Sequence, residues 1–165
     1  MGIAGTAVRR ILVDLASQCL RLVEDDALLL EAAVSTGRNG PGEGRDSGCT
    51  PRGLHRVCIR IGAGCPTGTV FVGRRPTGEV HSPELAACFP ERDWILTRIL
   101  WLTGLEPGRN RGGRVDTLRR YIYIHGCPET APMGVPLSHG CIRMRDPDLL
   151  RLFDLAPAGT LVDIH

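Results

Sequence analysis

Apolar and polar residues alternate along much of the chain, with the two-residue period that is typical of half-buried strands. The first such pattern covers residues 8–34, where alternating positions precede the acidic turn 24–26 and an apolar run follows it. This pattern predicts a strand pair. The same period, or a short run rich in β-branched and aromatic residues, predicts five further strands at residues 54–61, 69–72, 94–102, 118–125 and 161–164. For the run 94–102 a short helix is the alternative.

One convincing helix is predicted near the C-terminus. Asp146 and Pro147 suit the N-cap and the first helical position, and Pro157 would end the helix. The proline-rich segment 73–92 is predicted as a loop that contains a short helix at 84–88. The chain is therefore expected to be mainly β with one late helix, whose buried face would consist of Leu149, Leu150, Leu152, Phe153 and Leu155.

Length and composition indicate a single globular domain over residues 1–165. A chain of 165 residues can enclose a sizeable core, and 42% hydrophobic with 23% charged residues is ordinary for a folded protein. The formal charge of +2 favours no class of partner. A basic stretch comprises Arg109, Arg111, Arg114, Arg119 and Arg120. It is expected either to form a solvated loop or to attract anionic groups of a substrate. Because the stretch lacks interleaved aromatic residues, no nucleic acid partner is expected.

The N-terminal residues lack the basic segment and apolar run of a secretory signal. Gly2 and Thr6 fit only a loose form of the myristoylation pattern. No apolar run is long enough to span a bilayer, so no membrane span is expected. From the residues alone, the chain either stays in the cytoplasm or is a trimmed product. The oligomeric state is left open.

Seven cysteines are many for this length, and an odd number leaves at least one thiol unpaired. Cys19 and Cys58 lie in apolar runs and are expected to be small buried side chains. The spacings follow no recognisable disulfide framework. A zinc site is an alternative that no Cys-x-x-Cys pair supports, and its ligands would be Cys49, His55, Cys58 and Cys65. His55, His81 and His165 are otherwise expected at the surface.

The strongest chemical pattern combines a histidine and a cysteine. The apolar run 121–124 predicts a buried strand that ends at His125, and Cys141 follows sixteen residues later. A thiol is a good nucleophile only as the thiolate, and an imidazole beside it can take its proton. Gly140 leaves the adjacent backbone amides open to a developing oxyanion. A zinc site formed by His125, His139 and Cys141 is the direct alternative.

This segment resembles the catalytic signature of the L,D-transpeptidase (YkuD-type) family, in which a strand-borne His precedes a loop and Ser/Thr-His-Gly-Cys. Here the signature is His125, the run 138–141 and then Ile-Arg-Met, with Arg143 where the stricter form has Asn. The runs Ser-Thr-Gly at 35–37 and Thr-Pro-Arg-Gly at 50–53 also resemble family landmarks. The resemblance implies a β-sandwich of mixed sheets, with the cysteine in a cleft beneath a mobile flap.

The resemblance also implies a reaction that needs no cofactor or metal. Cys141 would attack the carbonyl before the terminal D-Ala of a peptidoglycan tetrapeptide stem, with His125 as base, to give a thioester. An amine of a second stem would then form a 3–3 crosslink, or a D-amino acid would exchange for D-Ala. Such an enzyme works in the periplasm or cell envelope. His139 and Ser138 would orient the base.

The remaining site residues are expected to bind substrate or to line the oxyanion site. Tyr123 lies on the same strand face as His125 and either lines the pocket or packs in the core. Arg143 would hold a substrate carboxylate, or else pair with Asp146 or Asp148. Ser138 would orient the base or serve as a turn hydroxyl. The full expected set is Gly140, Ser138, Arg143, Tyr123 and Gly126.

Two other functions remain open from the sequence. The same thiol would act as an L,D-carboxypeptidase or endopeptidase if water resolved the thioester. A zinc-binding or non-catalytic wall-binding module would retain the motif as scaffold.

Overall fold

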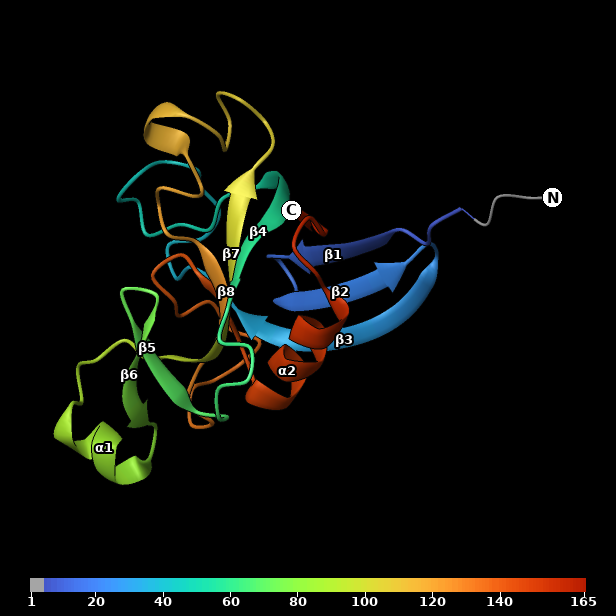
Figure 1. The fold of residues 1–165 in the computed structure, drawn as a ribbon. Coiled ribbons are helices and arrows are strands. Elements are labelled where there is room, and N and C mark those ends of the chain that lie inside the picture. The colour runs from blue at the N-terminus through green and yellow to red at the C-terminus, as the bar shows by residue number, and fades with distance from the viewer. Residues whose placement is uncertain (1–4) are drawn as a thin grey trace.

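The computed structural model describes residues 5–165 and shows a strand-dominated fold with two α-helices (Figure 1). The elements run in the order β1 (Arg9–Asp14), β2 (Cys19–Glu24), β3 (Ala27–Ser35), β4 (Gly53–Ile61), β5 (Thr69–Val72), β6 (Arg75–Val80), α1 (Pro83–Cys88), β7 (Ile95–Gly104), β8 (Tyr123–Gly126), β9 (Ile142–Met144), α2 (Asp146–Leu155) and β10 (Leu161–Ile164). Residues Gly113–Val115 add a single 3-10 turn.

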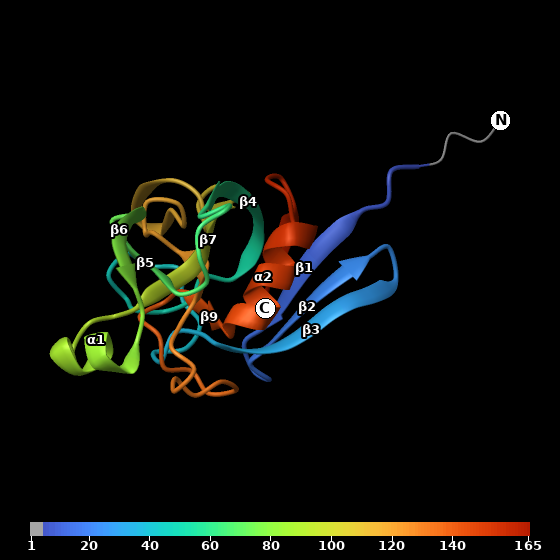
Figure 2. The same ribbon diagram turned by 60° about the horizontal axis from the view of Figure 1, so that its bottom comes forward.

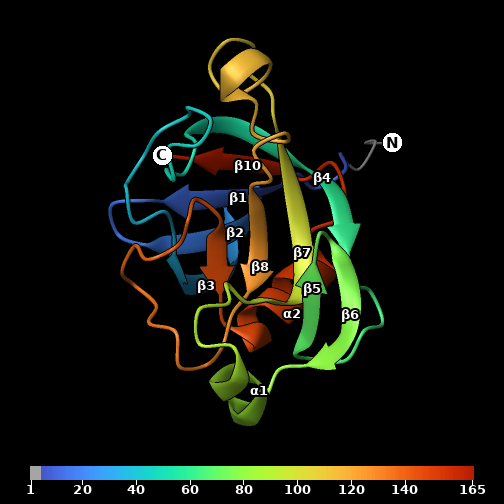
Figure 3. The same cartoon turned by 90° about the vertical axis from the view of Figure 1, so that its left-hand side faces the viewer.

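The ten strands form one sheet in the order β4-β10-β1-β2-β3-β9-β8-β7-β5-β6. An additional pairing of β4 with β7 closes the strands from β4 to β7 into a barrel (Figure 3). The long β7 makes this possible, because β4 pairs along residues 99–104 and β5 pairs with residues 95–96. Mainly β with one late helix is therefore confirmed, with a closed barrel in place of the two packed sheets of a sandwich.

Most of the buried apolar residues of the strands form one main core, to which α2 also contributes. Leu149, Leu152 and Phe153 of α2 are buried there, as predicted, whereas Leu150 and Leu155 are only partly covered. The hairpin β5–β6 and α1 extend at the end of the molecule opposite β1–β3 (Figure 2). Among the described residues, no helix is long and apolar enough to cross a membrane.

Three predicted elements differ from the structure at their turns. Residues 8–34 contain three strands, because Asp14 accepts hydrogen bonds from the amides of Ala16 and Ser17 and closes a turn inside the expected first strand. Strand β8 begins only at Tyr123, because residues 117–121 form a turn that ends at Tyr121 with a φ of 56°. Strand β6 lies within the expected loop 73–92.

The N-caps of the two helices can be compared with the helix starts expected from the sequence. Helix α1 confirms the short helix expected at 84–88, and its N-cap Ser82 accepts a hydrogen bond from the amide of Leu85 at 3.0 Å. The N-cap of α2 is Arg145 rather than Asp146, which is itself helical. Asp146 instead places its negative charge in the first turn, where the helix dipole favours it.

Candidate active site

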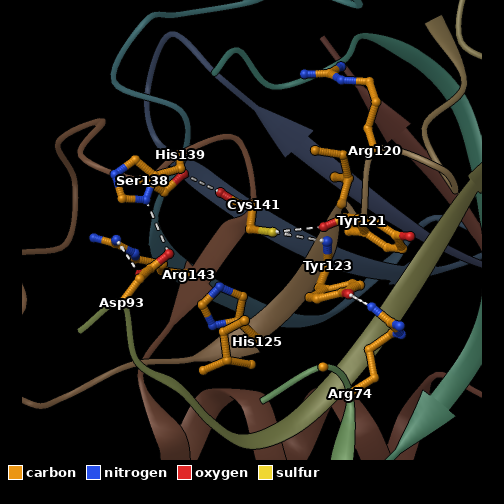
Figure 4. Close-up of a pocket in the computed structure, with 13 residues that line it drawn as sticks. Arg74, Asp93, Arg120, Tyr121, Tyr123, His125, Ser138, His139, Cys141 and Arg143 are labelled. Atoms are coloured by element: carbon orange, nitrogen blue, oxygen red, sulfur yellow. Dashed lines mark hydrogen bonds and ion pairs between the residues drawn. The ribbon is translucent and has the colours of Figure 1, made fainter. Parts of the chain in front are cut away.

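A cavity of about 290 Å³ opens over the ends of β8 and β9 (Figure 4). Cys141 and His125 both line it, together with side chains from the β5–β6 hairpin and from the segment before β7. The structure therefore brings together the histidine and the cysteine that the sequence analysis paired.

The register of β8 and β9 explains how these side chains meet. His125 lies opposite Arg143 in this parallel pair, so both side chains share one face of the sheet. Tyr123 and Cys141 each stand two residues earlier and belong to the same face. The amide of Tyr123 donates to Cys141 Sγ at 3.3 Å, which shows that these two residues are neighbours. The four form two rows, Tyr123 with Cys141 and His125 with Arg143.

The Cys141 thiol is held in its protonated form. Its Sγ donates to the carbonyl oxygen of Tyr121 at 3.3 Å and accepts from the Tyr123 amide. Burial raises the pKa of this thiol to about 12. The sulfur becomes a nucleophile only when a base takes its proton.

His125 lines the same cavity and is the candidate for that base. It is 2% exposed, and its Nδ1 lies 2.7 Å from the carbonyl oxygen of Gly126. A carbonyl only accepts hydrogen bonds, so Nδ1 carries the hydrogen and the lone pair is on Nε2. Burial lowers the pKa of His125, which keeps the ring neutral and able to accept a proton. The carbonyl that orients this ring belongs to Gly126, whereas the sequence analysis assigned that task to His139.

His139 and Arg143 share a partner that the sequence analysis missed. The Asp93 carboxylate accepts from Arg143 Nη2 at 3.0 Å and lies 3.1 Å from His139 Nδ1. Burial alone would raise the pKa of Asp93, but the hydrogen bond to His139 and the nearby charges outweigh burial and lower it. Arg143 therefore pairs with Asp93, and not with Asp146 or Asp148. No local sequence signal marks Asp93, which lies almost fifty residues before them.

The Ser138 side chain forms the hydrogen bonds that fix the turn before Cys141. The Ser138 hydroxyl donates to the carbonyl oxygen of Cys141 at 2.6 Å and accepts from the Gly140 amide at 3.1 Å. Ser138 is thus the turn hydroxyl that was one of its two expected roles. The Gly140 amide is engaged there and is not the open oxyanion donor that the sequence suggested. Gly140 has a φ of +128°, and a Cβ on it would stand 3.0 Å from the Cys49 carbonyl oxygen.

The runs 35–37 and 50–53, which resemble family landmarks, also bond to the loop before Cys141. The Thr50 hydroxyl donates to the Gly140 carbonyl oxygen and accepts from the Gly37 amide, each at 2.8 Å. The Ser138 amide donates to the carbonyl oxygen of Thr36 at 2.9 Å. Two segments that lie almost ninety residues or more before Cys141 therefore position the backbone of the loop that precedes it.

Two arginines complete the cavity on the side of the tyrosines (Figure 4). Tyr123 is buried yet lines the cavity, and its hydroxyl accepts from Arg74 Nη1 at 3.2 Å. Arg120 is the member of the basic stretch that reaches the cavity wall, but its guanidinium donates to the carbonyl oxygens of Gly42 and Cys49. In the rest of that stretch, Arg109 pairs with Glu106, and Arg111, Arg114 and Arg119 are exposed.

The geometry opposes both zinc alternatives. Among residues 5–165, no three His, Cys, Asp or Glu side chains are grouped so that they could hold a metal ion. His55 is fully buried rather than at the surface, and its two ring nitrogens bond the Gly53 carbonyl oxygen and the Thr117 hydroxyl. His81 is also partly buried, against the ring of Trp94.

The model of the L,D-transpeptidase catalytic domain family (YkuD) matches residues 8–164. The chain belongs to this family. It is 36% identical over 62 residues to a Bacillus subtilis (strain 168) protein named "Putative L,D-transpeptidase YkuD", a match that covers 34% of this chain and 38% of that protein.

Solved structures of L,D-transpeptidases share the fold. The Mycobacterium smegmatis enzyme superposes with a TM-score of 0.59 at 18% identity, covering 96% of this chain and 59% of that one. A domain from Xylanimonas cellulosilytica gives 0.54 at 22% identity, covering 98% of this chain and 62% of that one. A variant of the Enterococcus faecium enzyme gives 0.57 at 16% identity, covering 96% and 50%. This chain therefore spans less than two thirds of the relatives that it matches.

Proposed function

We propose that this L,D-transpeptidase family domain is a cysteine acyltransferase that acts on peptidoglycan tetrapeptide stems. The observation that carries the proposal is the pairing, in one cavity, of a protonated thiol and a neutral imidazole whose Nε2 lone pair is free. Family membership supports the substrate class. The acceptor is the amine of a second stem, which gives a 3–3 crosslink, or a free D-amino acid, which exchanges for terminal D-Ala.

The reaction begins when Cys141 Sγ bonds to the carbonyl carbon that precedes terminal D-Ala. His125 Nε2 takes the thiol proton in the same step, because a thiol with a pKa of about 12 supplies almost no thiolate at neutral pH. The backbone amide of Cys141 stabilises the oxyanion, a contribution of about 2.7–4 kcal/mol per donor in other enzymes. The Gly126 carbonyl stabilises the imidazolium that forms.

The intermediate collapses when the C–N bond breaks and His125 returns its proton to the departing amine of D-Ala. This leaves a thioester on Cys141. The acceptor amine then attacks the thioester, His125 takes a proton from that amine, and the thiol is released with its proton. Water as acceptor would give the tripeptide, which is the reaction of an L,D-carboxypeptidase.

The experiment uses a disaccharide-tetrapeptide with and without an added D-amino acid, with products identified by mass spectrometry. The intact protein, Cys141→Ala and Cys127→Ala are compared. Cys127 is a matched control, because it is a second buried thiol whose pKa is raised, to about 11, and it does not line the cavity.

Release of D-Ala by the intact protein and by Cys127→Ala, but not by Cys141→Ala, supports the proposal. Exchange products then identify a transpeptidase, and tripeptide alone identifies a carboxypeptidase. Undiminished release by Cys141→Ala would overturn the thiol mechanism. A carbapenem gives a second readout, because a covalent adduct in the intact mass tests the nucleophile without any stem peptide.

The proposed substrate places the working enzyme in the periplasm or cell envelope. Fractionation of cells that make the full-length protein, followed by detection of this domain, tests that location. Detection only in the cytoplasm would restrict the substrates to precursors and released wall fragments.

A further inference from the structure

The tip of the β5–β6 hairpin places an arginine where the backbone favours glycine. Gly73 and Arg74 connect Val72 to its partner Arg75, and their φ values are +56° and +65°. Two successive residues with positive φ form the tight hairpin turn in which Asn-Gly or Gly-Gly is usual. A long charged side chain at the second position is unfavourable for the turn itself, which points to a function for that side chain.

The Arg74 side chain is directed into the catalytic cavity (Figure 4). Besides its contact with the Tyr123 hydroxyl, its guanidinium carbon lies 4.7 Å from the ring centroid of Tyr121 and 5.1 Å from that of Trp101. These aromatic faces fix the plane of the guanidinium. Among residues 5–165, no carboxylate pairs with Arg74, so its positive charge is not neutralised. Nitrogen donors on Nε and Nη2 remain available.

A second guanidinium stands at the opposite end of the cavity, in the row of His125. Arg143 faces His125 across the β8–β9 pair, and Asp93 holds one of its nitrogens. Figure 4 shows Arg143 and Asp93 on one side of Cys141 and Arg74 on the other. The two guanidiniums therefore lie on opposite sides of the thiol.

The chemistry assigns the two halves of the substrate to these two sides. His125 must protonate the departing amine, so the released D-residue lies in the row of His125 and Arg143, where Arg143 can receive its terminal carboxylate. The residue that supplies the acyl group then lies on the other side, over Tyr123. Its side chain points toward Trp101, Tyr121 and the Arg74 guanidinium.

We propose that Arg74 binds a carboxylate on the side chain of the third stem residue, and thereby selects stems in which that residue is a diamino diacid with a free distal carboxylate. This inference rests on the proposed function and deepens it. A guanidinium held in plane by aromatic rings binds a carboxylate through two parallel hydrogen bonds. A carboxamide offers one acceptor and no charge, and the side chain of lysine would bring a like charge to Arg74.

The test compares three tetrapeptide donors that differ only at the third residue: a diamino diacid, the same residue with its distal carboxylate converted to a carboxamide, and L-lysine. Release of D-Ala is followed by mass spectrometry. We expect kcat/KM to be at least about tenfold higher for the free diacid than for the carboxamide, the size of one charge-assisted hydrogen bond. The lysine donor should be the poorest.

Three variants separate recognition from structure. Arg74→Gln should lose activity on the diacid donor alone, so that the preference over the carboxamide disappears. Arg74→Gly removes the guanidinium but suits the positive φ, so it should keep the fold, measured by thermal unfolding, and lose the preference as well. Arg111→Gln is the control for charge, because Arg111 is exposed and lies outside the cavity, and it should keep the full preference.

The outcomes distinguish this inference from the function on which it rests. Equal turnover of the diacid and carboxamide donors by the intact protein would overturn the role of Arg74 and leave the transpeptidase proposal standing. An equal loss on all donors in Arg74→Gln and Arg74→Gly would make Arg74 a structural residue and would also overturn it. Turnover of none of the donors, by a protein that forms no carbapenem adduct, would overturn both proposals.

Discussion

His55 and His125 occupy similar buried environments but differ in whether one ring nitrogen is left without a hydrogen-bond partner among the described residues. Both rings are buried, both have a pKa that burial lowers, and in both the Nδ1 atom bonds the carbonyl oxygen of a glycine, Gly53 at 2.9 Å and Gly126 at 2.7 Å. They differ at Nε2. In His55 this atom bonds the Thr117 hydroxyl at 2.9 Å, whereas in His125 it has no partner within residues 5–165 and the ring borders the cavity.

The comparison shows that burial and a fixed tautomer do not by themselves make a catalytic base. His55 meets both requirements and serves to join β4 to the turn that carries Thr117. A free lone pair that faces a reactive group is the additional requirement, and His125 meets its first part, because its Nε2 has no partner within residues 5–165 and the ring lines the cavity. Loss of His125 should therefore affect turnover, and loss of His55 should affect stability.

The largest expected effect follows from His125→Gln. The amide side chain is neutral and polar but cannot accept the thiol proton, so we expect kcat for D-Ala release to fall about 10³-fold, within the usual range for general base catalysis. The thermal unfolding midpoint should change little, because one hydrogen bond is at stake. Turnover within tenfold of the intact protein would show that another group takes the proton.

His55→Ala should show the opposite behaviour. The change leaves the Thr117 hydroxyl and the Gly53 carbonyl without partners in a buried site and opens a void, so the free energy of unfolding should fall by about 2–4 kcal/mol. Denaturant titration measures this loss. The kcat of the folded fraction should stay near that of the intact protein. A large drop in kcat without a loss of stability would end the distinction between the two histidines.

The sequence predicted the pairing of His125 with Cys141 but not all of the residues that surround the pair. His125 and Cys141 could be found because their signature is short, and the strand before His125 has a clear apolar pattern. Asp93 and Arg74 lack any local signal, because a single Asp or Arg in a loop does not reveal which part of the chain it faces. The Gly126 carbonyl was missed for another reason, since every residue has one and only the fold decides which of them meets a ring.

In the fold, too, elements with a clear local sequence pattern were predicted, whereas features that depend on a particular contact were missed. Alternation located most strands, and the short helix expected at 84–88 corresponds to α1. The turn after Asp14 was missed because Leu15 continues the alternating strand pattern, while the deciding interaction is one carboxylate with two amides. Strand β6 was hidden because Pro76 and Gly78 are typical of loops, although Pro is tolerated at the edge of a sheet, where β6 lies.

A smaller effect concerns pH and sharpens the comparison, because both rings should contribute to it. Burial lowers the pKa of His55 and His125 in the folded state, so below the unfolded value of about 6.5 the unfolded chain binds more protons. The free energy of unfolding should therefore decrease as the pH falls below about 6.5. Urea unfolding at pH 7.5 and at lower pH measures this slope.

His55→Ala should make that slope shallower, because one of the two rings is removed. The acid limb of kcat/KM should remain in the same variant, since His125 still loses its free lone pair on protonation. An unchanged stability slope in His55→Ala would mean that His55 does not resist protonation in the folded state.

The pairing of β1 with β10 has a consequence for how the protein is made. These strands lie side by side in parallel, with Ile11 opposite Val162, and β10 also pairs with β4. Of the ten strands, β10 leaves the ribosome last, so the nascent chain carries β1 and β4 with exposed edges until β10 has been made. The barrel closes only after residues 161–164 have emerged from the exit tunnel. Products of premature termination should therefore be prone to aggregation and to degradation.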